Sequence, residues 1–399
     1  MHFDAYREMT NYIEQYFNLN RILLLTVGLW PYQQSKLVRF QVISFFSILT
    51  SFIVFQFTKF MTAECTINLI IKILCCALFF IMSLITYNSF LINNQTVKYS
   101  LEQFRHIYNE LKDANEIAII KKYGYYAKRY TTRIILITLC SILFITLLPL
   151  WLHNIVQPVN KSRSHFVMLT ITEYFVDQEK YFYLILLHVN VAICIASIAV
   201  IATGTMLIVY LKFSCGMFTI ASYRIKQAMR VNILQKNPKN TIIIYKKMIY
   251  AVDIHRKAMN YAEHVINNFE GSFFSLITIS VCCLSLNLFE IFQTMSLKNI
   301  DQFLLHVVFI GIIVLYMFLA NYAGQEITDH HNHVFSTAYS VQWYTAPLHT
   351  QKLILFLLQR TNKTFSLNIG GLFVASLQCF ASLTSASMSY FTVIYSTQQ

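Results

Sequence analysis

Long apolar stretches, separated by polar ones, are the strongest pattern along this chain. Seven of them carry at most one charge and approach the ~20 helical residues that cross a bilayer. They cover residues 42–58, 69–92, 134–152, 181–211, 272–289, 302–325 and 364 to the C-terminus. A shorter run over 22–30 stops at Pro31 and predicts an interfacial or re-entrant segment. The pattern predicts an all-α, polytopic membrane protein with seven transmembrane helices.

Composition supports this class and excludes others. Of 399 residues, 56% are hydrophobic and 12% are charged, and that charged share is about half of what soluble domains carry. Soluble enzymes, disordered chains, collagen-like chains and disulfide scaffolds are excluded. The nine cysteines include no CxxC pair and lie mostly in apolar runs, which is typical of small buried side chains.

Lysine and arginine are divided unevenly between the two sets of connections. Of the 31 basic residues, 25 lie in the N-terminal arm and in the connections after the second, fourth and sixth stretches, and five lie in the others. Basic residues accumulate on the cytoplasmic side of membrane proteins. We therefore expect a cytoplasmic N-terminus and an extracellular C-terminus. The net charge of +13 is then mainly a topology signal, and we expect no nucleic-acid partner.

The long basic connections have a helical pattern of their own. Residues 100–130 and 215–270 combine mixed charge with helical periodicity, for example at Tyr245, Ile249, Val252 and Arg256. We expect cytoplasmic helical extensions of the membrane helices. They are either a packed subdomain that joins subunits or solvated amphipathic surface helices.

Catalytic and metal-binding chemistry has little support. The apolar stretches contain almost no Asp, Glu or His, the usual functional groups inside pumps and transporters. The one metal-like cluster is DHHNH over 329–333. On a helix His331 points about 100° away from His330, so we favour a solvated helix end. We expect no enzyme activity, no cofactor and no metal.

The last apolar stretch has a polar, uncharged stripe along one helix face, because its members are spaced four and three residues apart. Small hydroxyl side chains let helices pack closely and hydrogen-bond. Alternatively, the stripe lines water in a pore assembled from several subunits. The stripe consists of Gln378, Ser382, Ser385, Ser389, Thr392 and Ser396.

Large apolar side chains are frequent in the outer halves of the third, fourth and sixth stretches. They either form bundle core and lipid-facing surface or line a cavity for a small hydrophobic molecule. The cavity candidates are Phe144, Leu147, Trp151, Phe182, Tyr183, Leu187, Phe309 and Ile313. In the same outer region, the sequon at 160–162 predicts N-glycosylation of Asn160.

Several short segments, in order along the chain, resemble signatures of the insect odorant receptor family, of the hymenopteran type. The resemblance runs from about residue 18 to the last residue. The most diagnostic segment is the terminal SMSYFTVIYS. The matching segments are residues 20–31, 215–225 (CGMFTIASYRI), 251–258 (AVDIHRKA), 287–293 (NLFEIFQ), 320–330 (ANYAGQEITDH), 342–360 (QWYTAPLHTQKLILFLLQR) and 387–396.

This resemblance implies an odorant receptor that binds small hydrophobic odorants or semiochemicals. It would act as a subunit of a ligand-gated, non-selective cation channel, in a heterotetramer with the family's coreceptor. It implies a plasma-membrane location in the dendrites of olfactory sensory neurons. Three rival classes remain: a gustatory-type receptor of the same superfamily, a G-protein-coupled receptor with the opposite orientation, and a transporter or membrane enzyme, which would need ionisable groups inside the membrane.

The resemblance also assigns roles to residues. The polar stripe would line the pore, Val393 matches the family's hydrophobic gate, and Thr397 stands where the coreceptor has a second apolar gate residue. The subunit anchor would contain Trp343, Tyr344, Pro347, Leu353 and Leu357.

We expect one seven-helix domain over 1–399, divided into a cytoplasmic arm with a short re-entrant segment (1–41), helices one to four (42–211), a cytoplasmic helical loop (212–271), helices five and six (272–325), a cytoplasmic anchor segment (326–365) and a pore helix (366–397).

Overall fold

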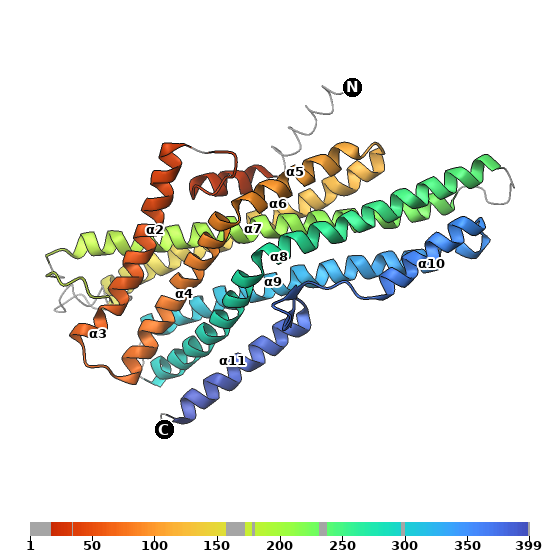
Figure 1. Cartoon of the computed structure of the whole chain (residues 1–399). Helices are drawn as coiled ribbons and strands as arrows, with labels where there is room; N and C mark the ends of the chain where they lie inside the picture. The colour runs from red at the N-terminus through yellow and green to blue at the C-terminus, as the bar shows by residue number, and fades with distance from the viewer. Residues whose placement is uncertain are drawn as a thin grey trace.

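A computed structural model describes residues 17–33, 35–156, 172–177, 180–230, 238–296 and 300–397. These residues form a helical bundle with one small hairpin (Figure 1). Residues 17–26 are helical. The elements that follow are α2 (Lys36–Phe57), α3 (Lys59–Thr62), α4 (Ile67–Ile92), α5 (Asn94–Glu110), α6 (Ala114–Val156), α7 (Phe182–Met229), α8 (Pro238–Ser296), α9 (Ile300–Ser340), the 3-10 turn η2 (Trp343–Thr345), α10 (Leu348–Asn362), β1 (Asn368–Ile369), β2 (Phe373–Val374) and α11 (Leu377–Thr397).

Local sequence sets where the first long helices begin. The Ser35 hydroxyl accepts a hydrogen bond from the Val38 N–H at 3.2 Å, at the start of α2. Thr66 does the same for Leu69 at 3.3 Å, at the start of α4. Each cap satisfies an N–H that the first helical turn leaves without a partner.

Among the described residues, six helices are long and apolar enough to cross a membrane: α2 with α3, α4, α6, α7, α8 and α9. The seventh predicted span is α11, which at 21 residues is also long enough for a bilayer of about 20 helical residues. Its hydroxyl side chains lower its hydropathy below that of the other six. Figure 1 shows the C-terminus at the end of the bundle away from α10.

α7 is the central helix of the bundle and packs against α2, α4, α6, α8 and α9. Its first half has no charge and is apolar on all sides, which is the pattern of a buried helix. Burial continues past the predicted span, since Met217, Phe218, Ile220 and Ile225 are all inaccessible to solvent.

The predicted helical extensions are present. α6, α7, α8 and α9 run for 43, 48, 59 and 41 residues without a break. Side chains along the extended parts, such as Met248, Ile254 and Val334, are buried in the largest apolar core. The extensions are therefore a packed subdomain, and the alternative of solvated surface helices is wrong. Their role in joining subunits stays a prediction.

The stretch before the last helix differs from the prediction. We expected one helix from residue 364 or 366, but α11 begins at Leu377. The preceding residues form an antiparallel hairpin in which Asn368 pairs with Val374 and Ile369 with Phe373. Gly370 and Gly371 make its turn with φ of 62° and 67°, a backbone region that glycine adopts without strain. Two adjacent glycines in an apolar run are the signal that a helix prediction overlooks.

The hairpin and the start of α11 are attached to α9. A Cβ on Gly324 would collide with the side chain and backbone of Ala375, so this close approach requires glycine. Asn321 accepts a hydrogen bond from the Ser376 N–H at 3.3 Å, and Gln325 accepts one from the Leu377 N–H at 3.4 Å. These contacts join α9 directly to the first turn of α11.

The DHHNH cluster lies within α9 and not at its end, and the expected solvent exposure holds for Asp329, Asn332 and His333 but is wrong for His331. His331 is fully buried and packs beside His255 of α8, with ring centroids 5.2 Å apart. His330 is hydrogen-bonded to the Tyr123 hydroxyl at 2.6 Å. The packing of α9 on α7 and α8 buries His331, although the sequence around it is polar.

The early run over 22–30 packs on the bundle, and its interfacial or re-entrant position in a membrane stays a prediction. The helix ends at residue 26 and the chain turns at Gly28, whose φ is 72°. Leu24 and Val27 are fully buried, and the Tyr87 hydroxyl donates a hydrogen bond to the Val27 carbonyl at 2.9 Å. This segment is therefore part of the bundle core.

Candidate functional site

The described helices leave a larger and a smaller cavity between them. The larger cavity has a volume of about 200 Å³ and is bounded by α4, α6, α7, α8, α9, the hairpin and the start of α11. The smaller cavity has a volume of about 70 Å³ and is bounded by α4, α6, α7 and α9. Phe79, Thr138 and Ile312 line both, so the two cavities share a wall.

The smaller cavity is apolar with a few uncharged polar groups. Its α4 wall is made by Cys76, Phe79 and Phe80, and its α9 wall includes Phe309. Asn190 of α7 contributes an amide group to the lining. Its Nδ2 donates a hydrogen bond to the Leu186 carbonyl of the same helix at 2.8 Å. Its described lining residues include no charged group. Such a lining suits a small hydrophobic molecule with at most one or two polar atoms.

An aromatic cluster packs beside the smaller cavity. The Tyr174 hydroxyl lies 2.8 Å from Nδ1 of His188, and the Ser51 hydroxyl lies 3.1 Å from its Nε2. Phe55 packs against Tyr174 with ring centroids 4.4 Å apart. This cluster joins α2, α7 and the segment 172–177, and it satisfies both nitrogens of a histidine that the sequence places near a helix end.

One residue, Glu173, ties the segment 172–177 to α2 and α3. Glu173 accepts from Lys59 Nζ at 2.9 Å and from the Thr62 hydroxyl at 3.1 Å. The backbone N–H of Glu173 donates to the Phe55 carbonyl at 2.8 Å. These contacts hold the aromatic cluster in place.

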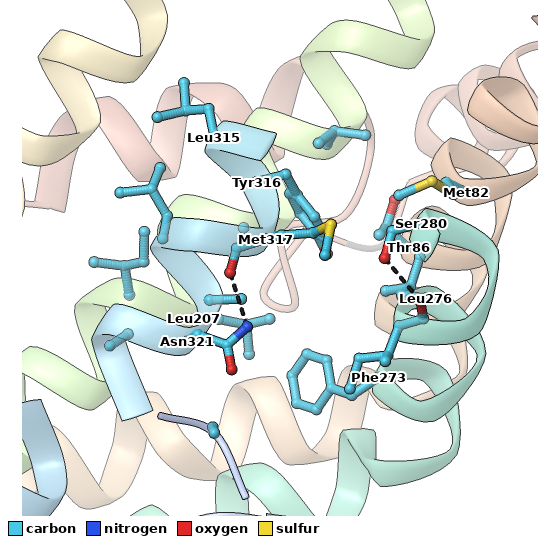
Figure 2. A pocket seen from close by; sticks show the side chains of 18 of the residues that line it. Met82, Thr86, Leu207, Phe273, Leu276, Ser280, Leu315, Tyr316, Met317 and Asn321 are labelled. Atoms are coloured by element: carbon cyan, nitrogen blue, oxygen red, sulfur yellow. Dashed lines mark hydrogen bonds between the residues drawn. The ribbon is translucent and has the colours of Figure 1, made fainter. Parts of the chain in front are cut away.

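The larger cavity is lined mainly by aliphatic and aromatic side chains (Figure 2). Its hydroxyl and amide groups are mostly engaged within their own helices. Thr86 donates to the Ser83 carbonyl at 2.8 Å, Ser280 donates to the Ile277 carbonyl at 2.8 Å, and Asn321 donates to the Met317 carbonyl at 2.9 Å. Polar side chains that satisfy themselves in this way leave an apolar interior surface.

The structure brings only part of the predicted ligand set to a cavity. Phe309 lines the smaller cavity and Ile313 lines the larger one. Phe144, Tyr183 and Leu187 are exposed on the outside of the bundle. The backbones of Leu147, Trp151 and Phe182 are in α6 and α7, but their side chains lie outside the described part, and Asn160 lies outside the described residues altogether.

Sequence reasoning missed the α4 wall. Cys76, Phe79 and Phe80 form one side of the smaller cavity, although only residues from other helices were named as candidates. A signal was available, because two adjacent phenylalanines precede Ser83 and Thr86 at helical spacing. That pattern puts aromatic and hydroxyl groups on one face, as the wall of an apolar cavity requires.

α11 packs with one face and exposes the other. Leu383, Ser387 and Phe391 are buried against the bundle. The members of the polar stripe are all exposed. Val393 is 58% exposed on this outward side, and Thr397 is exposed near the end of the helix. A single chain thus leaves the stripe and Val393 free for contact with water or with another subunit.

The predicted anchor residues surround η2 and α10. Leu357 is buried, Trp343, Pro347 and Leu353 are half-buried, and Tyr344 is exposed. The other face of α10 presents Leu348, Leu355 and Phe356 to solvent. An exposed apolar face of this kind indicates a contact surface for a partner.

Groups suited to metal binding are not assembled in the described part of the chain, where no three His, Cys, Asp or Glu side chains converge. The charged residues instead form ion pairs between helices. Arg224 of α7, for example, bonds Glu116 of α6 through two nitrogens at 2.6 and 2.7 Å.

Comparison with known proteins places these features in a context. The family described as "7tm Odorant receptor" matches residues 66–388. Odorant receptor 46a, isoform B, of Drosophila melanogaster is 30% identical over 118 residues. That alignment spans 29% of this chain and 30% of the fly protein.

Two solved structures share the fold. One is the insect olfactory receptor OR5 from Machilis hrabei in complex with eugenol, with a TM-score of 0.78 and 17% identity, covering 98% of this chain and 99% of that one. The other is the same receptor described without eugenol, with a TM-score of 0.75 and 17% identity, covering 98% of each chain. With six membrane-capable helices and this fold, the chain is a multi-pass membrane protein.

Proposed function

Because this chain belongs to the odorant receptor family, we propose that it is the ligand-binding subunit of an odorant-gated, non-selective cation channel. The observation that carries the proposal is the smaller cavity, which is apolar, uncharged and enclosed by α4, α6, α7 and α9. This is the lining expected for a small hydrophobic odorant or semiochemical. Family membership favours this function over a gustatory-type receptor or a G-protein-coupled receptor.

α9 offers the mechanical link between ligand and pore. It contributes Phe309 to the smaller cavity and, farther along, holds the start of α11 through Asn321 and Gln325. A ligand that binds more tightly when α9 is displaced favours that conformation by its difference in affinity. α11 then moves with α9 and widens a pore lined by the polar stripe and closed at Val393.

Assembly supplies the rest of the channel. One α11 has a single exposed polar face, so several copies must surround the axis to make a water-filled path. The exposed apolar face of α10 supports a subunit contact with the family's coreceptor, in a heterotetramer.

The distribution of basic residues supports a cytoplasmic N-terminus. An N-terminal epitope should therefore stain only after the cells are permeabilised.

Odorant-evoked current in cells that co-express the coreceptor is the test. A broad panel of small hydrophobic volatiles should contain compounds that evoke a cation current. Absence of any current, with surface expression of the receptor confirmed, would contradict the proposal.

A pair of variants on α7 then locates the site. Ile193 lines the smaller cavity and Leu187 is exposed on the same helix. Ile193→Phe should raise the half-maximal odorant concentration roughly tenfold or more, because overpacking costs about 1–3 kcal/mol. Leu187→Phe should leave it unchanged. Equal effects of the two variants would place the odorant elsewhere.

A further inference from the structure

We propose that the larger cavity is a second binding site, separate from the smaller cavity. It takes an elongated, neutral, apolar molecule that carries one oxygen function, such as a long-chain alcohol, aldehyde or ester. Binding there acts directly on α11. The inference goes beyond the proposed odorant site, because the larger cavity has its own walls from α8, the hairpin and α11.

The size of the larger cavity is the first argument. Protein interiors are close-packed, and voids much larger than a water molecule are few and destabilising. An apolar cavity of about 150 Å³ already binds a molecule the size of benzene. The larger cavity, at about 200 Å³, accommodates a longer occupant. It extends from α4 and α6 to the hairpin and the start of α11, so that occupant would lie along the bundle.

Gly204 is the second argument. It lies in the middle of α7 and lines the larger cavity, and a Cβ built on it meets nothing within 4 Å. Glycine inside a helix is less stable than alanine. No close helix contact requires glycine here, in contrast to Gly324, which faces Ala375. The absence of a side chain at Gly204 therefore leaves space in the cavity.

Tyr316 supplies the polar partner for the occupant. It lines the larger cavity from α9 (Figure 2), and within the described part of the chain no group is hydrogen-bonded to its hydroxyl. Tyr316 is half-buried, and a hydroxyl that faces an apolar cavity finds few protein partners there, so a ligand oxygen that bonds it gains affinity. The lining residues include no charged side chain. A carboxylate would lose its hydration there without compensation, which favours neutral oxygen functions.

The position of the cavity gives the site its effect. Cys379 and Leu383 of α11 and Phe373 and Ala375 of the hairpin form one wall. An occupant therefore contacts the first turns of the proposed pore helix without passing through the odorant cavity. The wall shared with the smaller cavity, which includes Phe79, allows occupancy of one cavity to influence the other.

Photolabelling of the full-length protein in lipid nanodiscs tests the proposal. The probe is a straight-chain primary alcohol with a diazirine on its chain, and labelled peptides are mapped by mass spectrometry. Label should appear on the α8 and α9 segments around Leu276 and Tyr316. Gly204→Leu should lower this label about tenfold, which corresponds to excluding roughly two buried methylene groups. Gly204→Ala should lower it less.

Matched controls separate the site from general effects. Gly311 also has open space around an added Cβ, but it is exposed and does not line the cavity. Gly311→Leu should therefore leave the label unchanged. Tyr316→Phe should lower labelling by the alcohol several-fold, but not labelling by a diazirine hydrocarbon of equal length.

Undiminished label in Gly204→Leu would overturn the proposal, as would label confined to the outer surface or to the smaller cavity around Phe309. Size-exclusion chromatography of each variant confirms that it is folded. Because labelling needs no current, its result is independent of whether odorants open the channel.

Discussion

Lys212 of α7 and Glu326 of α9 form an ion pair in the interior of the bundle, with Nζ 2.7 Å from Oε1. Their side chains are 6% and 18% exposed. The Lys212 ammonium also lies over the Tyr130 ring of α6, 4.5 Å from its centroid. Three helices therefore meet at one buried charge, close to the contacts by which α9 holds α11.

Removing one partner of this pair should be strongly destabilising. Lys212→Met leaves the Glu326 carboxylate buried and unpaired, which costs about 3–5 kcal/mol. The double variant Lys212→Met with Glu326→Leu should recover much of this loss. Thermal unfolding of the purified protein in detergent measures both. Arg256→Met, which breaks an exposed pair with Asp253, is the control and should have little effect. Equal losses of thermal stability in Lys212→Met and Arg256→Met would contradict this account of the buried pair.

The close approach of α9 to the hairpin predicts an asymmetry between two glycines. Gly324→Ala puts a Cβ into Ala375 and should destabilise the protein by about 1–3 kcal/mol. Gly311→Ala is the same change in the same helix with open space around it, and it should be neutral or stabilising by up to about 1 kcal/mol. Melting temperatures of the two variants check this. Stabilisation by Gly324→Ala would show that the hairpin does not pack as described.

Glu173 predicts a pH-dependent contact outside the membrane helices. Burial raises the pKa of the Glu173 carboxyl. The hydrogen bond from Lys59 and the charge of Lys59 together lower it by more, so the pKa is below its ordinary value. The contact between Glu173 and Lys59 therefore stabilises the fold fully above the pKa that this carboxyl has in the unfolded chain. The stabilisation is lost as pH falls through the lower pKa of the folded protein.

Glu173→Gln should accordingly lower the melting temperature at neutral pH and have a diminishing effect in acid. The comparison of variant and natural protein across a pH series is the measurement. A difference that stays constant down to strongly acidic pH would contradict the role of the Glu173 charge.

The pore assignment predicts opposite effects from two changes on α11. Val393→Ala removes apolar bulk at the proposed gate and should raise the basal current of the receptor–coreceptor channel. Ser389→Lys adds a positive charge to the polar stripe and should reduce cation current. Met388→Ala is the control, because Met388 is exposed next to Ser389, and it should change neither the basal current nor the evoked cation current. Whole-cell recordings at matched surface expression measure these currents. Unchanged currents in both Val393→Ala and Ser389→Lys would contradict the assignment of α11 to the pore.

The family resemblance and the apolar helices were readable in the sequence because both depend on local residue order. The apolar stretches follow from run length, the basic connections from the distribution of Lys and Arg, and the polar stripe of α11 from periodicity. The hairpin before α11 was missed, although Gly370 and Gly371 mark it, because a hydrophobic run containing two glycines was taken as part of a span. The gate, pore and anchor roles of named residues stay predictions.

Which side chains meet in space was decided only by the tertiary fold. Residues of the smaller cavity come from four helices that are far apart in the sequence. Tyr183 and Leu187 are large side chains in an apolar stretch, as Phe309 is, but they are exposed on α7 whereas Phe309 is buried on α9. His331 lies in a polar sequence and is nevertheless fully buried, because α9 packs there against both α7 and α8. Sequence determined the type of protein and its helices, whereas packing determined the cavities, because a cavity is the space that several helices leave between them.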